Sequence, residues 1–411
     1  MAKTKPAAGG RGGNESDPNG ESSNFNPWDP EQRPHRAAQF AAMRSGCPFA
    51  HTEHDGGYWV ASRYADVFEL AHQTNLFASS PGVMIPPIPR APQMHPMETD
   101  PPRHEALRKL LLPRFTPKVM AGWKPKVRGV INGLIDDFIE DGEAELTEAL
   151  VKPLPMFIIC TMMGIEDDID KFWGWIENII YGRLEDDPTA MNGACDALYA
   201  YMTELVAKRR AEGGGEDLVS LLLGADLEDS WMTEADMIGT CFFLLIAGLD
   251  NTGVGIRNGL RHVASDAELR DRLHGEPRLV ATAIEEVLRL YTPVSGLCRT
   301  ATKDTELEGR PVAEGERVLL LFASANRDET EFPDPDSFRV DRKINRHIAF
   351  GAGIHRCLGS NLARLEIRTA VEEVLRRMPD VRLCEGEDPD WFGFDPLRVE
   401  FTPGVREGEG A

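Results

Sequence analysis

The chain has 411 residues, and 42% of them are apolar, which is enough to bury a large core. Its 67 acidic and 45 basic residues give a formal charge of −22, and such a surface disfavours binding to nucleic acids. The seven cysteines lack the short spacings of a disulfide framework or a zinc ribbon, so we expect a protein of the reducing cytoplasm.

The N-terminal part begins with a polar stretch. Of the first 30 residues, 16 are Gly, Pro, Ser or Asn, and no apolar run follows that would serve as a signal peptide. We therefore predict a disordered lead over residues 1–30 and a single domain over residues 31–411. A short strand is predicted at Tyr58–Ala61, with a short helix after it.

A proline-rich loop follows over residues 80–102. Its eight prolines remove backbone donors, so we expect an ordered, irregular loop rather than a helix or strand. The loop also carries apolar residues that need a surface to cover, among them Met84, Ile85 and Ile88. It is either a lid over a binding site or a connector packed on the core.

Helical periodicity dominates from Arg103 to Arg289. The most apolar run, residues 237–249, is shorter than the roughly 20 residues that cross a bilayer, so we expect a buried helix and no membrane span. After Tyr291 come short β-like runs at 296–300 and 317–322, an irregular passage and one last amphipathic helix. The fold is thus predicted to be mainly α with small β-sheets.

The segment Phe350–Gly359, FGAGIHRCLG, is the most informative. Its glycines give a turn with little bulk, and the apolar spacing after Cys357 predicts a helix that begins near this cysteine. Backbone N–H groups and the positive end of a helix dipole stabilise a thiolate, the form of cysteine that binds iron. Without such context a lone cysteine is more often an inert core residue.

This segment resembles the haem-binding loop of the cytochrome P450 family in its Phe350, outer glycines, basic residue, Cys357 and Gly359. Other segments match in the family's order, so the resemblance covers about residues 55 to 403. It implies the cytochrome P450 fold, an α-rich lobe and a β-rich lobe around a buried haem b. It also implies that the Cys357 thiolate is the axial ligand of the iron.

Glu286 and Arg289 match the family's Glu-x-x-Arg pair. Their spacing places both on one helical face, and the resemblance makes them the structural lock beneath the haem. Family members usually complete this lock with an arginine where this chain has Ser337. The substitute is one of three residues: Arg339, Arg342 or His347.

Haem carries two propionate carboxylates, which need cationic or hydrogen-bonding partners. His104 and Arg108, four residues apart on one helical face, resemble the family's propionate-binding helix. Arg299 and His355 match the other family partners. Outside this context such residues would be solvated surface groups.

Residues 247–252, AGLDNT, resemble the family's oxygen-binding motif. Together with Phe243, the residues Ala247, Gly248 and Asn251 share one helical face, where small side chains leave room for a ligand; packing is the alternative reason for the glycine. Asp250 would be the proton-relay carboxylate. The family usually has Thr where this chain has Asn251, followed here by Thr252, and an amide holds water but does not relay a proton as a hydroxyl does.

The region from Arg103 to Arg128 reverses the sign of the overall charge, with eight Lys or Arg residues and the single acid Glu105. Arg356, Arg364 and Arg368 would add to the same face in the family's fold. Such a patch suits an acidic electron donor, although charges also simply follow solvated helix faces. We expect a ferredoxin with its NAD(P)H-dependent reductase as the donor, and a monomeric oxygenase.

The resemblance also indicates a substrate pocket, and its residues are nearly all apolar. They are Phe243, Leu244, Ala247, Gly248, Val294, Leu297 and Phe392, with Phe394 and the apolar part of the proline-rich loop beside them. A small hydrophobic substrate of terpenoid, aromatic or steroid-like character is expected. Recognition of a carboxylate by Arg90 is an alternative.

Three functions compete. The leading hypothesis is a monooxygenase that inserts one atom of O₂ into a C–H bond or removes an O-alkyl group. Asn251 motivates a second: a haem-thiolate enzyme that inserts no O₂-derived oxygen and performs a peroxide-driven reaction, a rearrangement or an oxidative coupling. The third, a haem protein that only binds a ligand, has no use for the acid at Asp250.

Overall fold

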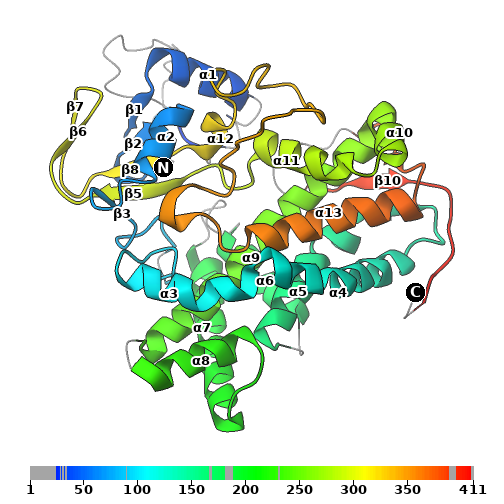
Figure 1. Cartoon of the computed structure of the whole chain (residues 1–411), viewed down its shortest axis with the longest axis horizontal. Helices are drawn as coiled ribbons and strands as arrows, with labels where there is room; N and C mark the ends of the chain where they lie inside the picture. Colours follow the sequence, from blue (N-terminus) through cyan, green and yellow to red (C-terminus); the bar gives the residue numbers. More distant parts are fainter. Residues whose placement is uncertain are drawn as a thin grey trace, which may run out of the picture.

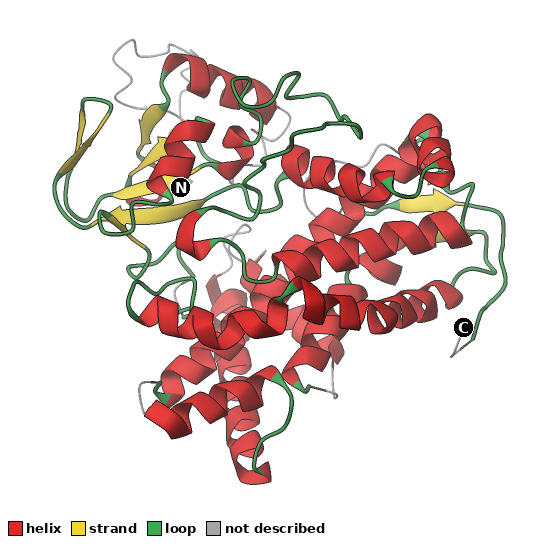
Figure 2. Ribbon diagram, in the orientation of Figure 1, coloured by secondary structure: helices red, strands yellow, loops and turns green. Residues whose placement is uncertain are grey.

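The computed structural model describes residues 25–27, 29, 32, 35–88, 90–165, 169–180, 188–229, 232–387 and 395–408. Helices dominate these residues, and most strands gather beside the first helices of the chain (Figures 1 and 2). The helices are α1 (Arg36–Gly46), α2 (Tyr64–Leu70), α3 (Arg103–Leu111), α4 (Pro117–Asp136), α5 (Pro153–Met163), α6 (Ile169–Ile180), α7 (Pro188–Glu212), α8 (Leu218–Asp229), α9 (Glu234–Ser265), α10 (Ala267–Gly275), α11 (Leu279–Tyr291), α12 (Phe322–Ala325) and α13 (Ser360–Arg377).

The strands form three sheets. The largest has the order β1-β2-β8-β5-β3, in which β2 and β8 run parallel and the other neighbours antiparallel. The strands are β1 (Phe49–Thr52), β2 (Tyr58–Ala61), β3 (Phe77–Ala78), β4 (Glu143–Glu145), β5 (Leu297–Ala301), β6 (Thr305–Leu307), β7 (Arg310–Val312), β8 (Arg317–Leu320), β9 (Arg382–Leu383) and β10 (Arg398–Glu400). The mainly α fold with small sheets is confirmed, and so is the strand predicted at Tyr58–Ala61.

The long helix α9 runs through the middle of the helical part and packs against α5, α7, α11 and α13 (Figure 1). Its start is fixed by a capping box, in which Thr233 and Asp236 each accept the other's backbone N–H. Gly255 and Gly259 let α13 approach closely, since a Cβ at these positions would lie 2.6 Å from Ile367 and 3.1 Å from Val371. This packing sets the position of the segment that precedes α13.

Among the described helices, α9 is the one that is long and apolar enough to cross a membrane. However, 67% of its most apolar window is buried inside the protein. The expectation of a buried helix is therefore met by a longer element than the apolar run indicated, because polar residues continue the helix beyond that run.

The proline-rich loop is ordered and packed, as expected. Val83, Ile85 and Met94 are at most 4% exposed, and the Glu98 carboxylate accepts the backbone N–H groups of Val83 and Met94. The loop is also anchored to the start of α9, where His95 Nε2 lies 3.3 Å from Asp236 Oδ1.

The N-terminal boundary stays a prediction, because residues 1–24 lie outside the described residues. Phe25 is the first described residue. Its ring packs against that of Phe40, with 6.2 Å between the two ring centroids.

Candidate active site

The loop before α13 holds Cys357 in a closed turn. The Cys357 N–H donates to the Phe350 carbonyl at 2.8 Å. Gly353 has a positive φ of 67°, and a Cβ there would lie 2.2 Å from the Ala71 carbonyl oxygen, so only glycine fits. The helix predicted to begin near Cys357 is α13, which begins three residues later at Ser360 with Gly359 as its N-cap.

The Cys357 side chain is accessible, and the protein around it shifts the pKa of its thiol. Its side chain is exposed, yet protein surrounds it closely enough that burial raises the pKa of its thiol. The Gly359 backbone N–H and the guanidinium groups of Arg108, Arg356 and Arg364 act in the opposite direction and favour the thiolate. A metal ion bound to the sulfur would add to the same effect.

Four basic side chains meet beside this loop. Their positions are linked by the rings of His104 and His355, whose centroids are 4.2 Å apart, and by Arg108, which donates to the Arg356 carbonyl at 2.8 Å. Burial and then the neighbouring arginines lower the pKa of His104 to about 4 and that of His355 to about 2. Burial also lowers the pKa of Arg299 to about 10. Two arginines beside two neutral imidazoles, which can donate hydrogen bonds, are suited to an anionic ligand.

The buried nitrogens of His104 test whether haem fits here. His104 is 2% exposed, and neither of its ring nitrogens has a hydrogen-bond partner among the described residues. An orphaned buried donor is costly unless a ligand satisfies it. Two carboxylates among His104, Arg108, Arg299 and His355, next to an accessible cysteine, match the chemistry of haem propionates and an axial thiolate.

One face of α9 is accessible although the helix is otherwise mostly buried. The partly exposed positions recur at helical spacing: Phe243, Ile246, Ala247, Gly248, Asp250, Asn251 and Val254. Within the oxygen motif, Asp250 and Asn251 thus share this face, whereas Thr252 is 6% exposed and turned into the protein. We call these seven residues the α9 stripe.

Two predicted pocket residues on α9 contact the protein interior. Leu244 is 7% exposed and belongs to the main core, outside the α9 stripe. At Gly248 a Cβ would lie 3.0 Å from the Ile159 side chain of α5, so the missing side chain gives room to Ile159. This is the packing alternative for the glycine, while Ala247 keeps the accessible face small.

The remaining predicted pocket residues have three different outcomes. Val294 and Leu297 are half-buried; Val294 lies in the segment between α11 and β5, and Leu297 is the first residue of β5. Phe392 and Phe394 lie outside the described residues. Arg90 forms an ion pair with Asp196 of α7, so a carboxylate already faces it.

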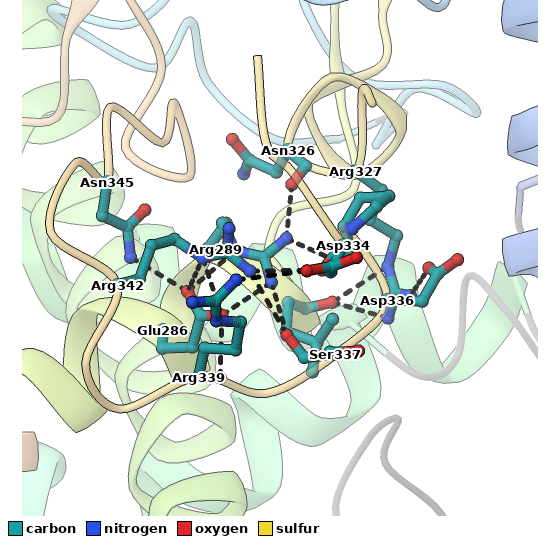
Figure 3. A network of polar contacts seen from close by, with 12 residues as sticks. Glu286, Arg289, Asn326, Arg327, Asp334, Asp336, Ser337, Arg339, Arg342 and Asn345 are labelled. Carbon is teal, nitrogen blue, oxygen red and sulfur yellow. Dashed lines mark hydrogen bonds and ion pairs between the residues drawn. The ribbon is translucent and has the colours of Figure 1, made fainter. Parts of the chain in front are cut away.

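The Glu286–Arg289 pair is the centre of a buried network (Figure 3). Both side chains are 0% exposed, and Arg289 donates to both carboxylate oxygens at 2.8 Å. Arg342 Nε lies 3.0 Å from each oxygen and completes the lock, and Asn345 adds a bond of 3.1 Å. Arg289 also donates to backbone carbonyls, those of Asn326, Pro335 and Ser337.

The other two candidates for the lock behave differently. Arg339 reaches Glu286 only through its backbone N–H, while its side chain pairs with Asp334. His347 binds Glu285, the residue before Glu286, at 2.9 Å. Glu285 was not singled out from the sequence, although the Glu-Glu dipeptide at 285–286 marks it.

Part of the basic region is already neutralised. Lys124 and Arg368 pair with Glu372, Arg128 pairs with Glu373, and Arg364 pairs with Glu285. By contrast, within the described chain no carboxylate is within ion-pair distance of four exposed cations, Lys109, Arg114, Lys118 and Arg356.

Comparisons with known proteins agree with this geometry. The family model of cytochrome P450 matches residues 182–390. A steroid C26-monooxygenase of Mycolicibacterium smegmatis is 35% identical over 358 residues, which cover 84% of this chain and 88% of the relative. A methyl-branched lipid omega-hydroxylase of Mycobacterium bovis is 36% identical over 345 residues, covering 80% and 79%.

Solved structures show the same relationship. A cytochrome P450 from Bacillus megaterium in complex with testosterone superposes with a TM-score of 0.82 and 30% identity, covering 90% of this chain and 99% of that structure. The cytochrome P450 of the Bacillus subtilis bacillaene polyketide synthase gives 0.83 and 28%, covering 92% and 100%. The fold and the relatives define a haem-thiolate enzyme with an iron haem and an axial cysteine. The chain belongs to the cytochrome P450 family and is a monooxygenase of that family.

Proposed function

We propose that this monooxygenase binds its haem iron through Cys357 and oxidises a hydrophobic steroid or branched lipid placed against the α9 stripe. The observation that carries the site assignment is the accessible Cys357 beside the partnerless nitrogens of buried His104. Haem, when bound, supplies the iron chemistry that activates O₂. The carboxylates of the haem would take the hydrogen bonds that His104 leaves unmade and would pair with the charge of Arg299.

The α9 stripe supports the substrate class. Phe243, Ile246 and Ala247 give an apolar surface, and we expect the half-buried Val294 and Leu297 to line the same pocket. Few polar groups interrupt this surface, so shape and burial would select the substrate more than hydrogen bonds. Relatives named for steroid and lipid hydroxylation, and a neighbour solved with testosterone, narrow the expected class to steroids and branched lipids.

Optical titration of the purified protein tests this assignment. Steroids, branched fatty acids, terpenoids and simple aromatic ethers are added while the haem Soret band is followed. A shift to the high-spin form with steroids or branched lipids is expected, because a bound substrate displaces axial water. A shift only with aromatic ethers, or with none of the compounds, would contradict the proposed substrate class.

The proposed electron donor is an acidic ferredoxin with its NAD(P)H-dependent reductase. We also propose that the oxygenase is a monomer in the cytoplasm. The surface that supports this choice of donor comprises the exposed cations Lys109, Arg114 and Lys118, which flank the 46% exposed Leu112 in the sequence, and Arg356 of the Cys357 loop. The α3 end of this surface contacts the Cys357 loop through Arg108, and Asn361 donates to the Phe115 carbonyl at 2.9 Å. Long-range attraction would speed encounter with an acidic protein.

Charge removal on this surface tests the donor proposal. The variant Lys109→Gln/Arg114→Gln/Lys118→Gln should slow reduction by a ferredoxin at low salt by about tenfold, and the difference should shrink as salt rises. Lys303→Gln, an exposed change in the β-rich part, is the control. Equal reduction rates for the triple variant and wild type would contradict the proposed surface.

Asn251 favours a second candidate, a haem-thiolate reaction without insertion of O₂-derived oxygen. On the α9 stripe an amide stands where the family usually has a hydroxyl, and Thr252 is turned away. Turnover with ¹⁸O₂ separates the two: labelled product supports the monooxygenase, and product formed with peroxide alone and without label supports the second candidate. Asn251→Ala should lower the coupling of electrons to product if Asn251 holds the proton-delivering water.

A further inference from the structure

The carboxylate of Glu285 joins three segments that meet at the Cys357 loop. It lies on α11 and accepts from Arg364 of α13 through two bonds, Nε to Oε1 at 2.7 Å and Nη2 to Oε2 at 2.8 Å. Its Oε2 atom also accepts from His347 Nε2 at 2.9 Å. One residue therefore holds both flanks of the loop, since His347 precedes it and Arg364 follows it.

The histidine contact has a defined direction. The Ala349 N–H donates to His347 Nδ1 at 3.2 Å, so Nδ1 carries a lone pair and Nε2 carries the proton that is given to Glu285. The His347 side chain is 2% exposed, and that of Glu285 is 29% exposed, so the histidine end of this bond is buried and the carboxylate end is partly accessible. His347 thus transmits the position of Glu285 to the first residues of the loop.

The arginine contact reaches the other side of the loop. The Arg364 guanidinium lies over the Phe350 ring, 4.4 Å from its centroid, and Phe350 is the residue whose carbonyl accepts the Cys357 N–H. The bidentate bond to Glu285 fixes the plane of this guanidinium and so its stacking. Although burial opposes it, the bonds from His347 and Arg364 hold the pKa of Glu285 at about 2, so the carboxylate stays ionised at neutral pH.

We infer that Glu285 is a positioning residue for the haem-thiolate bond: it clamps Arg364 onto Phe350 and His347 onto the loop entrance, and so keeps Cys357 in its ligating geometry. This role is separate from that of Glu286, whose carboxylate binds Arg289 and Arg342 and not Arg364. The inference rests on the proposed ligation of iron by Cys357. Because Arg364 pairs with Glu285, it is not one of the unpaired cations proposed to bind the electron donor.

The experiment compares Glu285→Gln with Glu372→Gln in the full-length haem-bound protein. Glu372 is a matched control because it lies on α13 and also holds cations, namely Lys124, Arg368 and, at 3.9 Å, Arg128, and among the described residues none of its ion pairs reaches the loop. Each protein is reduced under carbon monoxide in mild urea. The readout is the absorption spectrum of the carbon monoxide complex. We follow the rate at which the band of the thiolate-ligated haem converts to the shorter-wavelength band of haem that has lost the thiolate.

Glu285→Gln should convert about tenfold to 100-fold faster than wild type, as expected when a group that orients a metal ligand is removed. Glu372→Gln should convert at nearly the wild-type rate. Both variants should shift the midpoint of global urea unfolding to a similar extent. Conversion of Glu285→Gln at the rate of Glu372→Gln or of wild type would overturn the inference.

Arg364→Lys provides a second test if Glu285→Gln cannot be isolated with haem. Lysine keeps the charge but loses the bidentate bond and the stacking on Phe350, so faster conversion is expected, and a wild-type rate overturns the inference. The double variant Glu285→Gln/Arg364→Lys should be no faster than the more affected single variant, because both remove one interaction. A wild-type protein without the thiolate band would instead overturn the proposed ligation by Cys357 and this inference with it.

Discussion

The two sides of the proposed haem site differ in how they are held. On the Cys357 side, the carboxylates of Glu285 and Glu286 bind several donors each; the buried Glu286 accepts from Arg289, Arg342 and Asn345. On the α9 side, the accessible face is apolar apart from Asp250 and Asn251. Under the proposed function, iron ligation would depend on a fixed polar scaffold, and substrate choice would depend on the shape of an apolar surface that tolerates change.

The largest effect is expected at the cysteine itself. Cys357→His removes the thiolate that pushes electron density to the iron, so the thiolate band with carbon monoxide should vanish and oxygenation should fall below detection. The carbon monoxide difference spectrum and product analysis check this. Wild-type turnover by the variant would show that Cys357 is not the ligand.

The next effect concerns folding on the scaffold side. Glu286→Gln leaves Arg289, which is 0% exposed, with an uncompensated charge, and should cost about 3–5 kcal/mol of unfolding free energy. Urea unfolding measures it. Glu276→Gln, which removes an exposed pair with Arg278, should cost about 0–1 kcal/mol, and equal losses would contradict the difference between buried and exposed pairs.

A smaller effect is expected for haem retention. Arg299→Gln removes one charge-assisted hydrogen bond of about 1.5–3 kcal/mol to a propionate, so haem transfer to an acceptor protein should quicken roughly tenfold to 100-fold. Arg382→Gln, in an exposed pair with Glu400, is the control. An unchanged transfer rate for Arg299→Gln would remove Arg299 from the propionate site.

The pH dependence of stability sharpens the comparison further. Since the folded-state pKa of Glu285 is about 2, below the ordinary value of 4.5, its stabilisation is complete above pH 4.5 and is lost as the pH falls towards 2. Urea midpoints of wild type should therefore fall over this window. Glu285→Gln should give a shallower slope, and parallel slopes would show that Glu285 is not held ionised by its partners.

Sequence reasoning reached the scaffold side in part. The glycines and Cys357 of the loop, and the pair Glu286 and Arg289, stand in short local patterns whose spacing has a direct structural meaning. Arg342 could not be selected over Arg339 because both lie in an irregular passage, where no periodicity tells which side chain turns inwards. Tertiary packing decided it.

The α9 side was predictable in outline but not in detail. Helical spacing placed Phe243, Ala247 and Asn251 on one face, and the structure leaves that face accessible. Helical spacing could not show that Gly248 makes room for Ile159, because Ile159 lies on another helix, α5. The Glu285 clamp escaped detection for a similar reason: its partners lie on segments far away in the chain.

The most direct test of the account places bulk on the α9 stripe without touching the scaffold. In Ala247→Phe the thiolate band with carbon monoxide should remain, because Cys357 and its surroundings are unchanged. The high-spin shift of the Soret band with steroids and branched lipids should disappear, because the new ring fills the space against the stripe. Unchanged titration curves for Ala247→Phe would contradict the claim that this face of α9 receives the substrate.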